Sequence, residues 1–298
     1  MIRRKCEVLS VKSWGVYHSI TLVAPDISDD ARPGQFVQVG MPERREFMLR
    51  RPFSIHQASR KGGWAGTLEI AFTPVGPGTE WLTEVESHDF LDVLGPLGRP
   101  FPYPRGADNC LLVGGGYGAA PLYFLAEELR TRGKRVDMII GARTSDRVFK
   151  PVEAKRQSVS VTVTTEDGTM GTQGTVTDEL PAMLTRCQSQ VVYACGPNPM
   201  LRAVAEYCNE QSVPTQVALE ELMACGLGIC WTCVVPVIRR DGKGWDNLRA
   251  CVDGPVFSGA RVWWEKWLGA RSAPVQTPPQ GFDLDEVGVA KAEAWRPR

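Results

Sequence analysis

Four cysteines in the C-terminal third of the sequence have a spacing that could bind a metal cluster. Cys225, Cys230 and Cys233 form the pattern Cys-x4-Cys-x2-Cys, and Cys251 follows after 17 further residues. A plant-type [2Fe–2S] centre holds its two irons with four thiolates, three of them at this spacing. The spacing therefore predicts a [2Fe–2S] site on these four cysteines.

Two other uses of the same cysteines compete with this prediction. A structural zinc site usually draws on two Cys-x2-Cys pairs, and only Cys230 and Cys233 form such a pair. Disulfides need an oxidising compartment, which no pattern in the sequence indicates. Gly226 and Gly228 favour the cluster, because glycine permits a positive φ and lets backbone N–H groups approach cluster sulfurs. A zinc site and unliganded cysteines are the alternatives.

The composition excludes several other classes of function. The 298 residues carry 34 Lys and Arg against 34 Asp and Glu, so no net charge favours nucleic acid or an anionic membrane. No apolar run has the length of a membrane span or follows the basic N-terminus as a signal peptide would. We expect a cytoplasmic protein whose other cysteines are small core residues, namely Cys6, Cys110, Cys187, Cys195 and Cys208. With only three histidines, a multi-histidine metal site is not expected.

The first hundred residues alternate short β-like runs with turns, which predicts a small antiparallel barrel. The expected strands cover residues 5–11, 17–23, 35–39, 50–55, 67–73 and 89–94. In the fourth, Arg51, Pro52, Phe53 and Ser54 could hold a phosphate by charge, stack on a ring and bond a ring heteroatom. The alternative is an edge strand that begins at Pro52. His56 shares a strand face with Ser54 by alternation and is expected to be structural.

A glycine turn, Gly76-Pro77-Gly78-Thr79, precedes a helical pattern over residues 80–85. Free N–H groups at the start of a helix can bind a phosphate. An ordinary helix start after a turn explains the same residues.

The middle of the chain has the pattern of a parallel sheet with flanking helices. The apolar run 109–113 leads into a glycine loop with Gly114, Gly115, Gly116 and Gly118, and then into a helical pattern over 122–130. Strand, glycine turn and helix together are typical of a dinucleotide loop. Further β-like runs cover 135–141, 158–165 and 190–195, with helices near 177–184 and 200–210. Cys195, Gly196 and Pro197 end the last of these strands, where ligands of such sheets bind; a plain strand–helix connection is the alternative.

The choice between NAD and NADP stays open at this point. Asp137 falls inside a predicted strand rather than at its end, where a carboxylate would meet a ribose hydroxyl. Arg143 follows the same strand and could favour a 2′-phosphate.

The motifs in their order resemble a known family over about 265 residues. Arg51-Pro52-Phe53-Ser54 with Gly78-Thr79 is similar to the flavin domain of the ferredoxin–NADP reductase superfamily, in which the glycine loop and the Cys-Gly-Pro segment bind the nicotinamide cofactor. With the cysteine motif added, the chain resembles the electron-transfer subunits of class 1B dihydroorotate dehydrogenases. The resemblance implies FAD contacts at Arg51, Pro52, Phe53, Ser54, Ala71, Phe72, Thr73, Gly78 and Thr79. It implies NAD(P) contacts at Gly114, Gly115, Gly116, Gly118, Cys195, Gly196 and Pro197, with Cys195 beside the nicotinamide, and [2Fe–2S] ligands at Cys225, Cys230, Cys233 and Cys251.

This resemblance predicts a multi-domain β plus α/β protein. The expected parts are a flavin-binding barrel (1–103), a parallel-sheet nucleotide domain (104–220), a small [2Fe–2S] domain (221–268) and a disordered tail (269–298). It implies FAD, one [2Fe–2S] cluster, NAD and an FMN-containing partner in a heterotetramer of two plus two chains that oxidises dihydroorotate to orotate. A flavin can accept a hydride and release single electrons, so it belongs between nicotinamide and cluster. No catalytic acid, base or nucleophile is expected.

Related subunits compete with this assignment. Those of NADPH-linked ferredoxin oxidoreductases or sulfide dehydrogenases share the layout but tend to place aspartate where this chain has Cys225. An oxygenase reductase would need a longer ferredoxin domain before its last cysteine, and a zinc-binding scaffold without redox function would lack flavin. Near the end, Trp263 and Trp267 are four residues apart and would share a helix face. They would pack on the core or form a docking surface.

Overall fold

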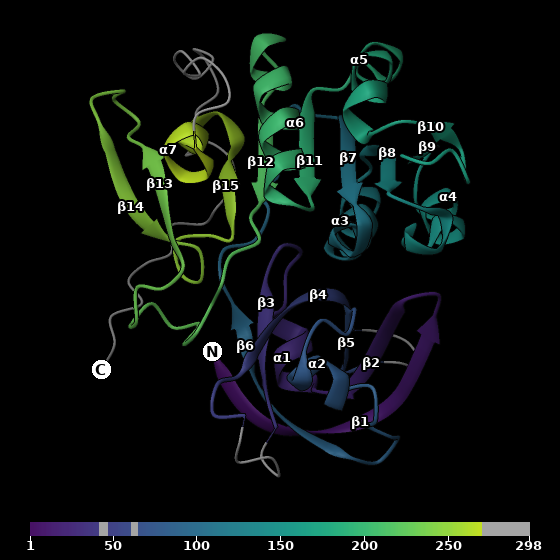
Figure 1. Cartoon of the computed structure of the whole chain (residues 1–298), viewed down its shortest axis with the longest axis vertical. Coiled ribbons are helices and arrows are strands. Elements are labelled where there is room, and N and C mark those ends of the chain that lie inside the picture. Colours follow the sequence, from purple (N-terminus) through teal and green to yellow (C-terminus); the bar gives the residue numbers. More distant parts are fainter. Residues whose placement is uncertain (42–46, 61–64, 270–298) are drawn as a thin grey trace.

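The computed structural model describes residues 1–41, 47–60 and 65–269, so the predicted tail lies, apart from Gly269, outside the described residues. Figure 1 shows an N-terminal barrel below a sheet flanked by helices, with a β-hairpin and a short helix beside one edge of that sheet. Within the described ranges, no helix is both long and apolar enough to span a membrane.

Six antiparallel strands close the N-terminal part into a barrel, as predicted, in the order β1-β2-β5-β4-β3-β6. Alternation along β4 explains how its two faces are used. Phe53 and Ile55 lie in the barrel core, whereas Ser54 between them is exposed on the outside. The elements are β1 (Ile2–Trp14), β2 (Tyr17–Val23), α1 (Pro25–Asp30), β3 (Phe36–Gly40), β4 (Arg51–Ser59), β5 (Thr67–Phe72), α2 (Pro77–Trp81) and β6 (Phe90–Leu97).

The helix predicted over residues 80–85 is shifted toward the N-terminus: α2 runs from Pro77 to Trp81 and includes only the first two residues of the predicted helix. Proline at the first helical position is already in a helical φ, so the helix starts inside the glycine turn. The chain leaves the helix after Trp81, and Leu82 and Val85 are buried in the barrel core. Burial of these two side chains decides the boundary, and the helical periodicity of the segment does not.

The middle part is a seven-stranded sheet in the order β10-β9-β8-β7-β11-β12-β15, parallel except for β15. Leu111 and Val113 of β7 pack on one face and Cys110 and Leu112 on the other, which explains its continuous apolar run. The elements are β7 (Asn109–Gly115), η1 (Gly116–Ala119), α3 (Ala120–Thr131), β8 (Arg135–Ala142), η2 (Ser145–Arg147), α4 (Pro151–Gln157), β9 (Ser160–Thr165), β10 (Thr172–Gln173), α5 (Val176–Cys187), β11 (Val191–Cys195), α6 (Asn198–Glu210) and β12 (Thr215–Ala218).

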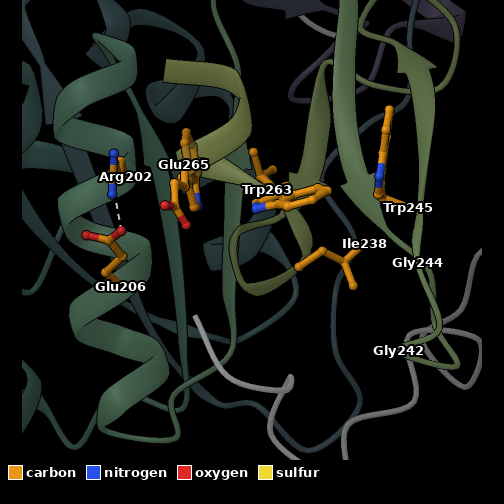
Figure 2. Close-up of a pocket in the computed structure, with 10 residues that line it drawn as sticks. Arg202, Glu206, Ile238, Gly242, Gly244, Trp245, Trp263 and Glu265 are labelled. Atoms are coloured by element: carbon orange, nitrogen blue, oxygen red, sulfur yellow. Dashed lines mark hydrogen bonds and ion pairs between the residues drawn. The ribbon is translucent and has the colours of Figure 1, made fainter. Parts of the chain in front are cut away.

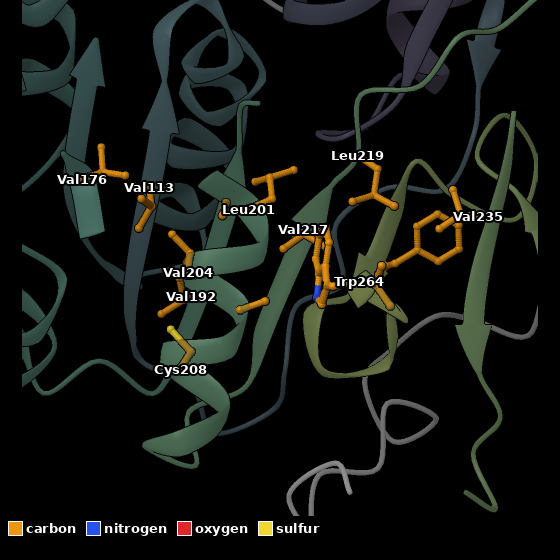
Figure 3. Packing of buried hydrophobic residues seen from close by; sticks show 14 of the residues in the cluster. Val113, Val176, Val192, Leu201, Val204, Cys208, Val217, Leu219, Val235 and Trp264 are labelled. Atoms are coloured by element: carbon orange, nitrogen blue, oxygen red, sulfur yellow. The ribbon is translucent and has the colours of Figure 1, made fainter. Parts of the chain in front are cut away.

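The C-terminal part shares its core with the sheet. Its β15 pairs antiparallel with β12, and Val217 and Leu219 pack in one cluster with Val235 and Trp264 (Figure 3). The segment between residues 221 and 268 therefore extends the nucleotide sheet as well as carrying a hairpin of its own. Its elements are β13 (Val234–Ile238), β14 (Trp245–Arg249), β15 (Val256–Ser258), η3 (Gly259–Arg261) and α7 (Trp264–Leu268).

The tryptophans near the C-terminal end pack on the protein. Trp264 is buried and its Nε1–H donates to the Gly259 carbonyl at 2.9 Å, and Trp267 packs against the same core. Trp263 directly precedes α7 and lies edge-on to Trp245, with 5.7 Å between ring centroids. Packing on the core therefore describes Trp264 and Trp267, whereas the half-buried Trp263 contacts Trp245 outside that core cluster.

The five cysteines outside the motif, namely Cys6, Cys110, Cys187, Cys195 and Cys208, are all buried, as predicted.

Candidate functional site

The four motif cysteines lie at one end of the β13–β14 hairpin. Cys233 directly precedes β13, and Cys251 follows β14 by one residue. The Ala250 N–H donates to the Cys233 carbonyl at 2.8 Å, which extends the hairpin pairing and brings both buried cysteines together. Cys225 and the exposed Cys230 come from the loop that joins β12 to the hairpin. The hairpin thus supplies two ligand positions and the loop the other two.

The thiols influence one another, with Cys233 and Cys225 acting on Cys251 and Cys225 acting on Cys230. Burial, and then the neighbouring Cys233 thiol, raise the pKa of Cys251 to about 12. Hydrogen bonds from the Thr232 hydroxyl and backbone N–H, and then from Cys225, lower the pKa of Cys230 to about 6. Among the described residues, no three His, Cys, Asp or Glu side chains are arranged around one point as a single metal ion would require. Four cysteine thiols are the ligand set of a [2Fe–2S] centre.

Backbone geometry around these thiols also fits a [2Fe–2S] group. Gly226 and Gly228 adopt φ of 70° and 77°, as their predicted role requires. The Leu227 N–H points to Cys225 Sγ at 3.3 Å, and the Arg249 guanidinium holds the loop through the Gly228 carbonyl at 2.9 Å. Four thiols with N–H groups aimed at sulfur are the donor set that such a cluster needs.

The predicted FAD residues fall on the barrel side that carries β4 and α2. The Arg51 guanidinium lies over Gly78: a Cβ atom built on Gly78 would be 3.0 Å from Arg51 Nε. Thr79 Oγ1 accepts from the N–H groups of Val75 at 2.8 Å and Gly76 at 3.2 Å, which fixes the turn. An arginine beside a glycine turn is suited to hold a diphosphate.

The remaining FAD residues differ in what they offer. Phe53 and Phe72 lie in the barrel core with ring centroids 5.7 Å apart, and Ala71 is also buried. Contacts from Phe53 and Phe72 to a flavin would therefore come mainly from their backbone. Ser54 is exposed, and Pro52 and Thr73 are half-buried.

The two predicted nucleotide segments touch each other. A Cβ on Gly118 would lie 2.5 Å from Gly196 Cα, and a Cβ on Gly115 would lie 2.5 Å from Met200 Sδ and 3.0 Å from Pro197 Cδ. Both loops end neighbouring parallel strands, at the edge of the sheet where such folds bind ligands. Glycine is required here because the two backbones approach closely.

Cys195 of β11 lies directly beside Gly114 of β7, the first of the four glycines in the predicted nucleotide loop. Burial raises the pKa of Cys195 to about 12. A thiol in this state is a poor nucleophile. The residue would shape the site through its packing.

Two further buried polar residues lie next to the predicted sites: Gln38, to which the sequence assigned no role, and His56, which was expected to be structural. Gln38 is a buried amide on β3, and His56 is a buried imidazole on β4. The signal for Gln38 was a polar residue inside the apolar run Phe36–Gly40, and the signal for His56 was its place two residues after Ser54.

A pocket of about 250 Å³ lies away from these residues, between α6, the hairpin and α7 (Figure 2). Arg202 and Glu206 of α6 form an ion pair at 2.8 Å on one side, and Trp245 and Trp263 line the other. Lys266 lies over the Trp245 ring, 4.4 Å from its centroid. None of the predicted cofactor residues lines this pocket.

Two family models match the chain. Residues 220–263 match the iron–sulfur cluster binding domain of dihydroorotate dehydrogenase B, and residues 112–206 match an oxidoreductase NAD-binding domain. The first match includes strands β13, β14 and β15 and all four motif cysteines. The second includes the loop that begins at Gly114 and the loop at Gly196.

Similar proteins span nearly the same length. The electron transfer subunit of dihydroorotate dehydrogenase B (NAD(+)) from Desulforamulus reducens is 38% identical over 81% of this chain and 90% of its own. The corresponding subunit from Bacillus caldolyticus is 39% identical over 82% of this chain and 92% of its own length. Among solved structures, a chain of an NADH-dependent reduced ferredoxin-NADP oxidoreductase has a TM-score of 0.77 and 30% identity, covering 89% of this chain and 92% of that one.

Proposed function

This chain belongs to the family of the electron transfer subunits of dihydroorotate dehydrogenase B (NAD(+)), and we propose that it carries electrons between a catalytic partner subunit and NAD. The observation that carries the proposal is the placement of three cofactor sites on one chain. A barrel with Arg51 over a glycine turn, two touching glycine loops and a four-cysteine hairpin follow one another along the chain, which supports three adjacent sites for FAD, NAD and the cluster. The partner would oxidise dihydroorotate to orotate in pyrimidine biosynthesis.

The proposed cofactors are FAD, NAD and one [2Fe–2S] cluster. A flavin exchanges a hydride with a nicotinamide and single electrons with an iron–sulfur cluster, which is the chemistry that this pair of cofactors supplies. Arg51 and the turn at Gly78 and Thr79 would hold the FAD diphosphate, and Ser54 would face the ring. Gly114 to Gly118 with Gly196 and Pro197 would bind NAD. Cys225, Cys230, Cys233 and Cys251 would ligate the irons.

The protein's own contribution is to bind, align and shield. The close approach of Gly118 to Gly196 brings the two loops together at the sheet edge, where a nicotinamide would be oriented by contact with both of them. Cys233 and Cys251 are buried and would shield one side of the cluster from water, whereas the exposed Cys230 would face a partner. We propose a heterotetramer of two catalytic and two electron transfer chains, working in the cytoplasm.

The test is purification of the tagged chain with its bound partner, followed by an assay of dihydroorotate-dependent NAD reduction. We expect an FMN-containing partner in equal amount and NADH formation that requires both chains. Capture of a ferredoxin-linked partner, without dihydroorotate activity, would replace the proposal with the related NADPH-linked ferredoxin oxidoreductases. That second candidate is supported by the structural similarity at 30% identity. Cys225 at the first ligand position supports the dihydroorotate assignment, because those relatives tend to have aspartate there.

A further inference from the structure

The side chain of Gln38 is a polar group without a partner in the interior of the protein. Gln38 is 0% exposed, and within the described part of the chain neither its Nε2 nor its Oε1 has a hydrogen-bond partner. Burying an amide in this way is unfavourable, and an apolar side chain of the same size would avoid the penalty. The residue therefore points to a bonding group that the polypeptide does not supply.

The strand that carries Gln38 places this amide outside the barrel. Val37 and Val39 on either side of it point into the barrel core, so alternation turns Gln38 outward. In the barrel its backbone pairs with Pro52 of β4 on one side and with Leu94 of β6 on the other. Gln38 is thus a direct neighbour of the strand segment Arg51 to Ser54 that is assigned to the flavin.

The other end of the side chain reaches the cysteine loop. A Cβ on Gly226 would lie 2.5 Å from Gln38 Nε2 and 2.8 Å from its Cγ, so the amide is packed directly on the Gly226 backbone. Gly226 follows Cys225 and adopts a φ of 70°. Two separate constraints, the positive φ and the contact with Gln38, both require glycine at this position.

The surrounding charged groups do not account for the amide. Arg50, which directly precedes β4, donates to the Asp92 carbonyl at 2.8 Å and pairs with the Asp92 carboxylate. The loop itself offers Cys225, whose Sγ already receives the Leu227 N–H. Gln38 Nε2 packs on Gly226, the residue that follows Cys225, so the amide lies beside the Cys225 end of the cluster site.

We propose that Gln38 donates its side-chain N–H to sulfur at the Cys225 end of the [2Fe–2S] cluster, across the boundary between the flavin barrel and the cluster. The inference rests on the proposed function, because it needs the cluster to be bound. Gln38 is then a positioning residue that stabilises the more negative, reduced cluster and so raises its reduction potential. It also explains why a polar residue interrupts the apolar strand.

The test compares Gln38→Leu with Gln35→Leu in the full chain carrying FAD and cluster. Gln35 is the matched control, because its Nε2 donates to the Gly98 carbonyl at 2.8 Å and its Oε1 accepts from the Arg32 N–H at 2.9 Å. We expect Gln38→Leu to move the cluster potential, followed by EPR during a redox titration, to a more negative value. We expect the flavin potential to stay constant. Gln35→Leu should lower the melting temperature and leave both potentials unchanged.

A second apolar variant, Gln38→Met, guards against a packing defect of leucine. An unchanged cluster potential in whichever of the two Gln38 variants assembles a cluster would overturn the inference. Thermal unfolding gives an independent readout. In the cluster-free chain the amide has no partner, so replacing Gln38 should leave the melting temperature equal or raise it. In the cluster-bound chain the same replacement should lower the melting temperature. A wild-type chain that shows no [2Fe–2S] signal at all would refute the proposed function instead, so the two failures are distinguishable.

Discussion

His56 of the barrel and Ala120 of the nucleotide domain are joined by a buried hydrogen bond, in which the imidazole Nδ1–H donates to the Ala120 carbonyl at 2.7 Å. Because a carbonyl can only accept, this ring nitrogen carries the proton. The other nitrogen, Nε2, lies 2.9 Å from the ammonium of Lys150 and accepts from it. His56 is two residues after Ser54, and Ala120 begins the helix that follows the glycine loop. The bond therefore ties β4, which carries the proposed flavin residues, to the helix that directly follows the proposed nucleotide loop.

This bond predicts a pH-dependent stability. Burial, and then the positive charge of Lys150, lower the pKa of His56, while Glu69 and Glu153 oppose the shift. An unfolded chain takes up a proton near pH 6.5 that the folded chain does not. The free energy of unfolding therefore has its full value above about pH 6.5 and falls with pH toward the lower folded pKa, by at most about 1.4 kcal/mol per pH unit. We expect the melting temperature to fall between pH 7.5 and 5.5.

His56→Asn should lose most of this dependence, because asparagine can donate to Ala120 but does not titrate. His88→Asn is the control, since the His88 side chain is exposed on the barrel surface beside Glu7. It should follow the wild-type profile. Equal slopes for wild type and His56→Asn would show that another group causes the effect.

The cysteine assignment predicts a clean separation of two activities. Cys230→Ser should remove the cluster, and with it about two irons per chain, while NADH still bleaches the flavin. None of the residues assigned to FAD or NAD lies in the Cys230 loop, so their sites should stay intact. Iron analysis and stopped-flow absorbance measure the two effects.

Cys208→Ala, in the buried face of α6, is the control and should keep the cluster and lose only stability. Loss of flavin reduction in a folded Cys230→Ser chain would show that the electron order is wrong.

The contact between the two nucleotide loops predicts a specific defect. A methyl group at residue 118 would lie 2.5 Å from Gly196 Cα, so Gly118→Ala must push the loops apart. We expect a stability loss of about 1–3 kcal/mol and an NADH affinity about tenfold lower, equivalent to about 1.4 kcal/mol. Titration calorimetry with NADH on the flavin-loaded chain measures the second effect.

Gly133→Ala is the matched control for this substitution. Gly133 has a φ of 75° and open space around its Cβ position, so alanine there should cost about 1–2 kcal/mol of stability. NADH affinity should not change. Similar affinity losses in both variants would mean that general destabilisation, and not the loop contact, weakens binding.

Local patterns in the sequence were enough to predict the barrel, the parallel sheet and the cysteine loop. The alternation around Ile55, the apolar run at Leu111 and the glycines at 226 and 228 each have one physical explanation, and the structure agrees with all three. The helix after Gly76 was displaced, because the burial of Leu82 depends on the closed barrel and leaves no trace in local periodicity. Gly226 and Ala120, which contact the side chains of Gln38 and His56, lie more than 60 positions away from them in the sequence. The surroundings of these two side chains could therefore be seen only in the three-dimensional structure.

Asp137 provides the last prediction, which concerns the choice between NAD and NADP. Its carboxylate is buried inside β8, where Arg135 Nε donates to it at 2.8 Å and Ser160 Oγ at 2.6 Å. Burial opposes ionisation, but these hydrogen bonds outweigh it and lower the pKa of Asp137. A carboxylate with both oxygens bonded inside the strand is not available to a ribose hydroxyl. Arg143, by contrast, is exposed just after β8 ends at Ala142.

Asp137→Asn should therefore cost about 1–3 kcal/mol of stability and leave the ratio of kcat/KM for NADH and NADPH unchanged. Arg143→Ala should raise that ratio by weakening the use of NADPH, because an arginine at the end of this strand can pair with a 2′-phosphate. Steady-state reduction of a dye acceptor by each nucleotide, measured on both variants and on wild type, gives the ratios. A changed ratio in Asp137→Asn alone would place the ribose at the buried carboxylate, contrary to its position in the strand. A ratio unchanged in Arg143→Ala would remove Arg143 from the nucleotide site and leave discrimination to the backbone of the glycine loop.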